Sequence, residues 1–331
     1  MVAGATAYGL ELLAVARIHR VPDADPDAVL VPIAWAERSL PSHDGGTINL
    51  VDTGEAVSSN VRSNLAEPLP TLVFSHGVTL SIRTWVRQID TFAREGFRVV
   101  AFDHRGHGGA ALGRNGFGVT DIGDDIDTLL EVLDLNKVIL IGHSMGGIAA
   151  QSYLVRHREA ANRRVCGLVL LSTLPSAMSG SQAARFGKVV ERVTRRTPDS
   201  TRLWAHPHLG LLLARFGFGR DPRASDVELV RQMMLECDRK TRVEGPRSLI
   251  GFDLVRELGS ISQPTLVIGG TADVITPPHD SQRMHDAIVG SELILFEGGG
   301  HMLMLERYRE VNEAIRSFAL KCAARRAGRQ T

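Results

Sequence analysis

The chain has 331 residues, of which 44% are hydrophobic and 23% charged, and its formal net charge is +1 at pH 7. This is the composition of an ordinary globular protein, long enough for a large α/β domain with an insertion. The near-neutral charge offers no strongly basic face to neutralise phosphates, so no nucleic-acid partner is expected. Cys166, Cys237 and Cys322 are far apart and odd in number, which favours reduced thiols and a cytoplasmic location. A disulfide between Cys166 and Cys237 stays open as an alternative.

Residues 1–32 are predicted to form an N-terminal helix and a linker. The apolar stretch from Val2 to Ile18 is interrupted by Glu11 and Arg17, is too short to cross a bilayer and lacks the basic leader of a signal peptide. A helix here would place apolar residues on one face, namely Leu10, Leu13, Ala14 and Ile18. We expect this face to dock on the body of the protein, with peripheral contact to a membrane surface as the alternative.

From residue 33 onward, apolar runs alternate with helical patterns, which predicts a mostly parallel sheet with crossover helices. The expected strands are 47–51, 71–74, 98–102, 138–141, 168–171, 265–268 and 292–296, and the expected helices are 84–95, 121–133, 144–156, 278–289 and 305–320. Their nearly continuous apolar character is typical of strands covered by helices on both faces. Residues 33–174 and 261–331 are thus predicted to be the two parts of one core.

The alternation stops between residues 175 and 260, where amphipathic, arginine-rich segments are interrupted by prolines. An insertion at this place would cover the edge of the sheet at which the strands end, so these residues are predicted to form a helical lid. Some of its apolar residues are candidates for lining an apolar acyl pocket, although packing between lid helices explains each one of them as well. The candidates are Leu203, Trp204, Leu212, Phe216 and Met234.

A nucleophile is expected at Ser144. The run Gly142-His143-Ser144-Met145-Gly146-Gly147 lies where an apolar strand gives way to a helix. A serine on such a sharp turn is lifted out of the sheet, and small flanking residues let the strained backbone approach the next helix. Taken alone, the motif is also compatible with an ordinary glycine-rich turn between a strand and a helix.

Two residues further along the chain supply the partners that a serine nucleophile needs. His301 follows a strand and the turn Gly298-Gly299-Gly300, so it is the candidate general base. Asp273 follows the strand that ends at Ile268, at the same edge of the sheet, and is the candidate acid that orients the imidazole. The chain order serine, aspartate, histidine is the one expected for this arrangement.

An oxyanion hole is expected from two backbone amides. The N–H of Met145, directly after the nucleophile, is one donor, and the N–H of Val78, in the loop Ser75-His76-Gly77-Val78-Thr79, is the best candidate for the other. His76 precedes the nucleophile strand and is expected to brace this loop rather than to act as a base.

With Ser144, Asp273, His301 and His76-Gly77 in this order, the chain resembles the α/β-hydrolase superfamily from about Ile48 to Phe318, outside the lid. The segment Asp103-His104-Arg105-Gly106-His107-Gly108 also matches the family and looks like a structural turn, so Asp103 is given no catalytic role. Epoxide hydrolases and haloalkane dehalogenases carry an aspartate at the elbow, whereas the serine here implies acyl transfer to water. The motif and the lid are most similar to monoacylglycerol-lipase-type lipases and esterases.

This resemblance implies a serine esterase or lipase that acts on a small-molecule ester with an apolar acyl group and needs neither a metal ion nor an organic cofactor. A cofactor-free perhydrolase or haloperoxidase and a carbon–carbon bond hydrolase use the same triad, so both stay open as alternatives. A protein of a different class, which binds a hydrophobic ligand without catalysis, would usually have lost a member of the triad. None is lost here.

Overall fold

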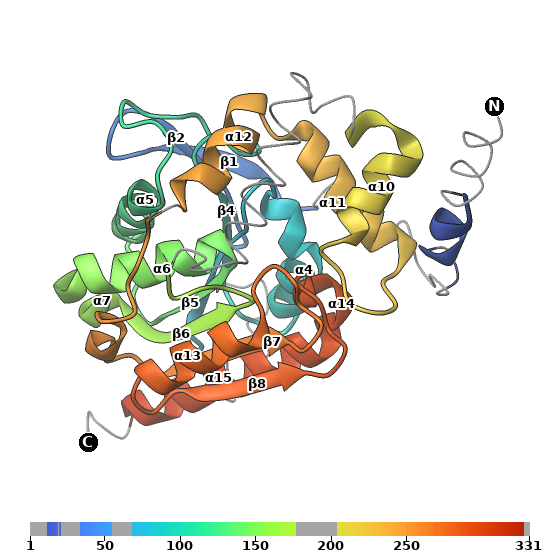
Figure 1. Cartoon of the computed structure of the whole chain (residues 1–331). Helices are drawn as coiled ribbons and strands as arrows, with labels where there is room; N and C mark the ends of the chain where they lie inside the picture. The colour runs from blue at the N-terminus through green and yellow to red at the C-terminus, as the bar shows by residue number, and fades with distance from the viewer. Residues whose placement is uncertain are drawn as a thin grey trace.

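The computed structural model describes residues 12–18, 20, 34–54, 68–176, 204–249 and 251–327. An eight-stranded sheet in the order β1-β2-β4-β3-β5-β6-β7-β8 runs through the molecule (Figure 1). The two pairs β1–β2 and β2–β4 are antiparallel and all others are parallel. The strands are β1 (Glu37–Pro41), β2 (Thr47–Asp52), β3 (Thr71–Ser75), β4 (Val99–Asp103), β5 (Val138–His143), β6 (Val165–Leu171), β7 (Thr265–Gly270) and β8 (Glu292–Phe296). The predicted α/β-hydrolase architecture, with its mostly parallel sheet, is confirmed.

Helices cover both faces of the sheet because successive strand residues alternate between two apolar clusters. In β3, Leu72 and Phe74 belong to one cluster and Val73 to the other. The first cluster also holds residues of η1 (Ile82–Trp85), α4 (Val86–Arg94), α14 (Leu303–Glu306) and α15 (Tyr308–Ala327). The second holds residues of α5 (Val119–Val132), α6 (Met145–Arg156), α7 (Arg158–Arg164), η2 (Leu258–Ser260) and α13 (Pro278–Ala287).

Strand β1, helix α7 and the C-terminal helix differ most from the expectations. Strand β1 was not predicted, because its sequence Glu37-Arg38-Ser39-Leu40-Pro41 is mostly polar and exposed at the edge of the sheet. The short helix α7 was also missed. The helix expected over 305–320 is two helices, α14 and α15, and the second extends to Ala327.

Between β6 and β7 the described residues 204–249 form three helices, α10 (Pro207–Arg215), α11 (Ala224–Glu236) and α12 (Arg239–Ser248), which we call the lid helices. They lie together on one side of the sheet (Figure 1). Leu211 of α10 and Leu229 of α11 are buried in the same apolar cluster as α4 and α15. Helices α10 and α11 therefore share a core with one face of the sheet.

Residues 12–18 are helical, but the expected docking face is wrong in part. Ile18 is buried and Val15 packs beside it on the first cluster, whereas Leu13 is 67% exposed. A helical turn of 3.6 residues places Val15 and Ile18 on one side and Leu13 on another. Leu10 lies outside the described residues. None of the described helices combines the length and the hydropathy needed to span a bilayer.

All three cysteines are free thiols, so the disulfide left open by the sequence is absent. Burial raises the pKa of Cys237 and of Cys322 to about 12. A protonated thiol is a poor nucleophile, so we assign these two residues to packing.

Candidate active site

Ser144 sits on a strained turn between β5 and α6. Its backbone has φ 52° and ψ −120°, a conformation that L-residues rarely adopt. Two hydrogen bonds hold it there: the Ser144 N–H donates to the Leu171 carbonyl at 3.1 Å, and the Thr173 hydroxyl donates to the Ser144 carbonyl at 2.6 Å. All residues from Val138 to Leu154 except Ser144 are buried, so Ser144 is the one residue of this segment that is partly exposed.

The turn requires glycine at Gly146. A Cβ atom added there would lie 2.3 Å from the Ser75 carbonyl oxygen and 2.5 Å from that of His76. Both are backbone atoms and cannot rotate away. The first turn of α6 therefore packs directly on the loop after β3, which brings the nucleophile and the expected oxyanion loop together.

The structure joins Asp273 and His301 in a buried pair. The distance between His301 Nδ1 and Asp273 Oδ2 is 2.9 Å, and the same carboxylate accepts hydrogen bonds from the Ile275 and Thr276 N–H groups and from the Thr276 hydroxyl. Burial by itself would raise the pKa of Asp273, but the His301 imidazole and the hydrogen bonds from Thr276 hold it below its ordinary value. The carboxylate is thus ionised and fixes the ring in the orientation that a general base needs.

His301 lies against the strand end that carries the nucleophile. The rings of His143 and His301 are 4.7 Å apart, and His143 Nε2 lies 3.0 Å from the His301 carbonyl oxygen, to which it donates. No hydrogen bond joins the Ser144 hydroxyl to the imidazole in the described residues around the site. Catalytic hydrogen bonds are often long in the absence of substrate and shorten when it binds.

The Met145 and Val78 amides stay predicted donors of an oxyanion hole, and the structure describes both segments that carry them. Met145 is the first residue of α6, so its N–H belongs to the first helical turn, where amides have no partner within the helix. The loop that contains Val78 is held by its neighbours: the Thr79 N–H donates to His107 Nε2 at 3.0 Å. Thr79 itself has φ 62°. The loop is thus conformationally restricted, and its backbone N–H groups can be preorganised before substrate binds.

His76 braces this loop, as its sequence position suggests. It donates from Nδ1 to the Gly77 carbonyl at 2.7 Å, and its Nε2 accepts the His104 N–H at 3.0 Å. Its ring stacks on that of His104 with centroids 4.0 Å apart. Burial lowers the pKa of both histidines well below the usual value, so both are neutral. A neutral histidine with both ring nitrogens occupied is a structural residue.

Asp103 also proves structural. It accepts hydrogen bonds from the Ile82 N–H at 2.8 Å, the Gly109 N–H at 3.0 Å and the Asn49 amide at 2.8 Å. Burial raises the pKa of Asp103 to about 6 in spite of these donors. Arg105, two residues on, is buried and pairs with Asp125 at 2.8 Å.

The candidate pocket residues lie among the lid helices. Trp204, Leu212 and Met234 are partly buried against the first apolar cluster, whereas Phe216 is 60% exposed. Leu203 lies outside the described residues. That these side chains line an acyl pocket stays a prediction.

Several supporting residues were missed at the sequence level. Thr276, Thr173 and His143 each bond directly to a triad residue. His143 is part of the elbow motif and Thr276 precedes two prolines that start a helix, so both had a weak local signal. Thr173 had none, because only the folding of β6 beside β5 brings it to the elbow.

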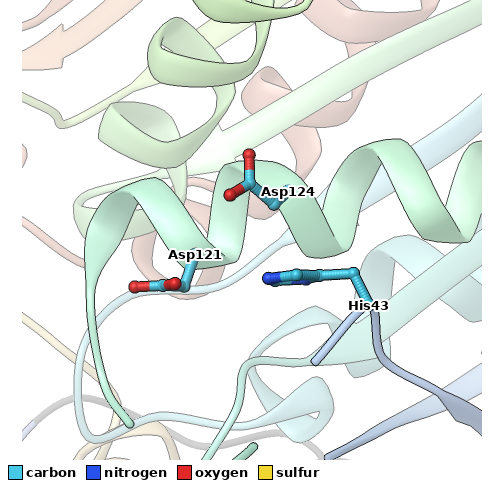
Figure 2. A group of neighbouring side chains, drawn as sticks. All are labelled: His43, Asp121 and Asp124. Carbon is cyan, nitrogen blue, oxygen red and sulfur yellow. The ribbon is translucent and has the colours of Figure 1, made fainter. Parts of the chain in front are cut away.

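One group of three side chains in the described ranges, His43, Asp121 and Asp124, could supply ligand atoms to a metal ion, all within 4.8 Å of one another (Figure 2). Both acids already face arginines: Asp124 pairs with Arg156 at 2.9 Å, and Asp121 lies 3.9 Å from Arg105. A divalent cation would have to displace or oppose these charges. We therefore interpret the two acids as members of ion pairs, and the contact between α5 and the β1–β2 loop is made by Asp125, 3.2 Å from His43 Nδ1.

Comparison with known proteins agrees with this geometry. A family model described as the alpha/beta hydrolase fold matches residues 70–308. A non-heme chloroperoxidase from Burkholderia pyrrocinia is 31% identical over 216 residues, which cover 63% of this chain and 77% of that protein. The bifunctional esterase/perhydrolase DCH from Acinetobacter calcoaceticus is 27% identical over 258 residues, with 75% and 91% covered. The esterase EaEST from Exiguobacterium antarcticum has a similar structure, with a TM-score of 0.72 at 21% identity over 86% of this chain and 99% of that one. The chain therefore belongs to the α/β-hydrolase family.

Proposed function

We propose that this hydrolase cleaves carboxylic esters with an apolar acyl group, through an acyl-enzyme on Ser144. The observation that carries the proposal is a serine on a strained, partly exposed elbow at the same edge of the sheet as a buried Asp273–His301 pair at 2.9 Å. This combination holds a nucleophile, a base and an orienting acid at the same edge of the sheet. The esterase names of relatives support the choice of an ester substrate.

In the proposed reaction, the Ser144 oxygen attacks the ester carbonyl while His301 Nε2 takes the hydroxyl proton. The Met145 and Val78 amides stabilise the negative charge that develops on the carbonyl oxygen. The tetrahedral intermediate collapses, the ester C–O bond breaks, and His301 returns the proton to the departing alcohol. A water molecule, activated by the same histidine, then hydrolyses the acyl-enzyme and restores Ser144. Asp273 stays ionised and stabilises the imidazolium in both halves.

A second candidate reaction is transfer of the acyl group to hydrogen peroxide. It is favoured by the names of two relatives, a non-heme chloroperoxidase and a bifunctional esterase/perhydrolase. The first half of the reaction is the same. Peroxide replaces water in the second, and the product is a peracid.

Fluorophosphonate labelling combined with a p-nitrophenyl ester series from acetate to palmitate tests the proposal. We expect covalent labelling of Ser144 and turnover that peaks at medium or long acyl chains. Ser144→Ala should lose labelling and lower kcat by about 10³-fold or more, with the thermal transition preserved. Labelling without ester turnover, but with peracid formed from a carboxylic acid and peroxide, would replace the esterase with the perhydrolase. An unlabelled wild-type protein would favour a non-catalytic, ligand-binding role.

A further inference from the structure

A partly buried carboxylate that takes no part in the proposed chemistry lies five residues after His301. Glu306 ends α14, and both of its carboxylate oxygens accept backbone N–H groups. Oε2 accepts from Gly219 at 2.8 Å and from Gly300 at 3.1 Å, while Oε1 accepts from Met302 at 3.1 Å. Two of these donors flank His301 and the third belongs to the segment that links the lid helices α10 and α11.

That lid segment is also bonded directly to the histidine loop. The Gly217 carbonyl accepts the N–H groups of His301 at 2.9 Å and Met302 at 3.2 Å. Gly219 and Gly300 lie in close contact, because a Cβ atom on Gly219 would come within 2.7 Å of the Gly300 nitrogen. The loop that carries the catalytic histidine thus rests on residues 217–219 of the lid and not on the core alone.

On the lid side, Arg215 holds the same segment through its carbonyls. At the end of α10, its guanidinium donates to Phe218 O at 2.9 Å and to Arg220 O at 2.8 Å. Glu306 binds the segment through an N–H group and Arg215 through oxygens. The two opposite charges also act on each other, since Glu306 raises the pKa of Arg215 against the lowering effect of burial.

We propose that Glu306 is a positioning residue that ties the lid segment 217–219 to the His301 loop and so sets the place of the catalytic imidazole. The contact couples the lid to the chemistry: a change in the lid segment reaches His301 through Gly217 and Glu306. Burial raises the pKa of Glu306, and the three N–H donors oppose that shift. Both oxygens act as acceptors, which is the pattern of an ionised carboxylate.

Glu306→Gln tests the inference, which rests on the proposed esterase function. The amide keeps the shape of the side chain but replaces one of the two carboxylate oxygens by an NH2 group, so at least one of the three backbone N–H donors would face another donor and the His301 loop should shift. We expect kcat and the rate of Ser144 labelling to fall about 10- to 100-fold, as a misplaced catalytic group would cause. KM should stay within about 3-fold, because no substrate contact is removed.

Glu310→Gln is the matched control. Glu310 is exposed on α15, and its only partner among the described residues is Arg307, at 3.6 Å. The kcat, KM and labelling rate of the Glu310→Gln variant should equal those of the wild type. A Glu306→Gln protein that folds and is labelled at the wild-type rate would overturn the inference. So would a variant in which KM alone rises.

Arg215→Gln probes the same contact from the lid side and serves if Glu306→Gln fails to fold. It removes both carbonyl contacts, and we expect a smaller fall in kcat, again without a matching rise in KM. The kcat of the double variant should fall by less than the product of the two single fold-changes, because both substitutions act on the same lid segment. Fully multiplicative effects, or an Arg215→Gln protein with wild-type kcat, would count against the inference. Failure of the esterase proposal is distinguishable, since the wild-type protein itself would then show no ester turnover, whether or not Ser144 is labelled.

Discussion

One edge of the sheet carries Ser144, Asp273 and His301, and we call it the catalytic edge after the proposed reaction. This edge and the lid helices are built by different kinds of interaction. At the catalytic edge, backbone atoms come within contact distance at Gly146 and buried hydrogen bonds converge on Ser144, Asp273 and His301. The lid helices are held by apolar packing and by long arginine side chains that reach from one element to another. The first kind of interaction fixes a few atoms tightly, as acyl transfer requires, and the second holds a surface in place while allowing its side chains to vary.

Helix α11 shows how the lid is attached. Asp226 is fully buried and pairs with Arg87 of α4 and Arg223, each at 2.8 Å. The Thr84 hydroxyl lies 3.5 Å from the sulfur of buried Met233. These contacts join the lid to the segment that follows the predicted oxyanion loop. The lid helices and the catalytic edge therefore meet around the site, although different kinds of interaction hold them.

The largest effect is expected at the catalytic edge from Asp273→Asn. The asparagine keeps the size of the side chain but removes the charge that stabilises the imidazolium and fixes its tautomer, so kcat should fall about 10³- to 10⁴-fold. Steady-state kinetics with a p-nitrophenyl ester measures it. Asp280→Asn, at another buried aspartate, which pairs with the half-exposed Arg283 at 3.0 Å, is the control and should keep its activity. A loss of less than tenfold in Asp273→Asn would contradict the assigned role.

The next largest effect is expected from Gly146→Ala. The added Cβ would collide with two backbone carbonyls, so either α6 or the oxyanion loop must move, and we expect the free energy of unfolding to fall by about 3 kcal/mol or more. Urea denaturation provides the measurement. Gly259→Ala is the control, because its Cβ would meet only the Ala287 carbonyl at 3.7 Å. Equal stabilities of the two variants would refute the close approach.

Acid should weaken the catalytic edge through its buried histidines. Burial lowers the pKa of His76, His104 and His143 well below the usual value and that of His107 to about 4. Below pH ~6.5 the unfolded chain therefore binds more protons than the folded one, and the free energy of unfolding falls as pH falls, by up to about 1.4 kcal/mol per pH unit for each histidine. Asp103, with its pKa raised to about 6, opposes this trend between pH ~4 and 6.

Urea denaturation at several pH values between 7 and 5.5 measures the effect. His107→Asn should reduce the slope of unfolding free energy against pH by about one proton. A His107→Asn slope equal to that of the wild type would show that this histidine titrates alike in both states.

The smallest effect on stability is expected in the lid, from Phe216→Ala. The side chain is 60% exposed, so its loss should change the free energy of unfolding by less than about 0.5 kcal/mol. If Phe216 contacts the acyl group, KM for long-chain esters should rise several-fold while KM for acetate stays constant. Val289→Ala, at another exposed apolar site, is the control for both measurements. An unchanged chain-length profile would remove Phe216 from the predicted pocket.

Local pattern was enough to predict most of the sheet, the turn at Ser144 and the proximity of Asp273 to His301, while the catalytic roles of these three residues stay predictions. The strands are continuous apolar runs because they are covered on both faces, and the triad residues follow strands that end at one edge of the sheet. Strand β1 escaped prediction because an edge strand needs no apolar pattern, and the outward direction of Leu13 depends on which side of its helix finds the core.

The sequence by itself determined the order of elements, the elbow at Ser144 and the partners Asp273 and His301, because each is signalled by residues next to it in the chain. Only the tertiary structure decided what holds them in place. Thr173 and Glu306 act through contacts with segments up to 87 residues away, as between Glu306 and Gly219. Such contacts leave no periodic or local pattern in the sequence, since they arise only when separate strands and the lid pack together.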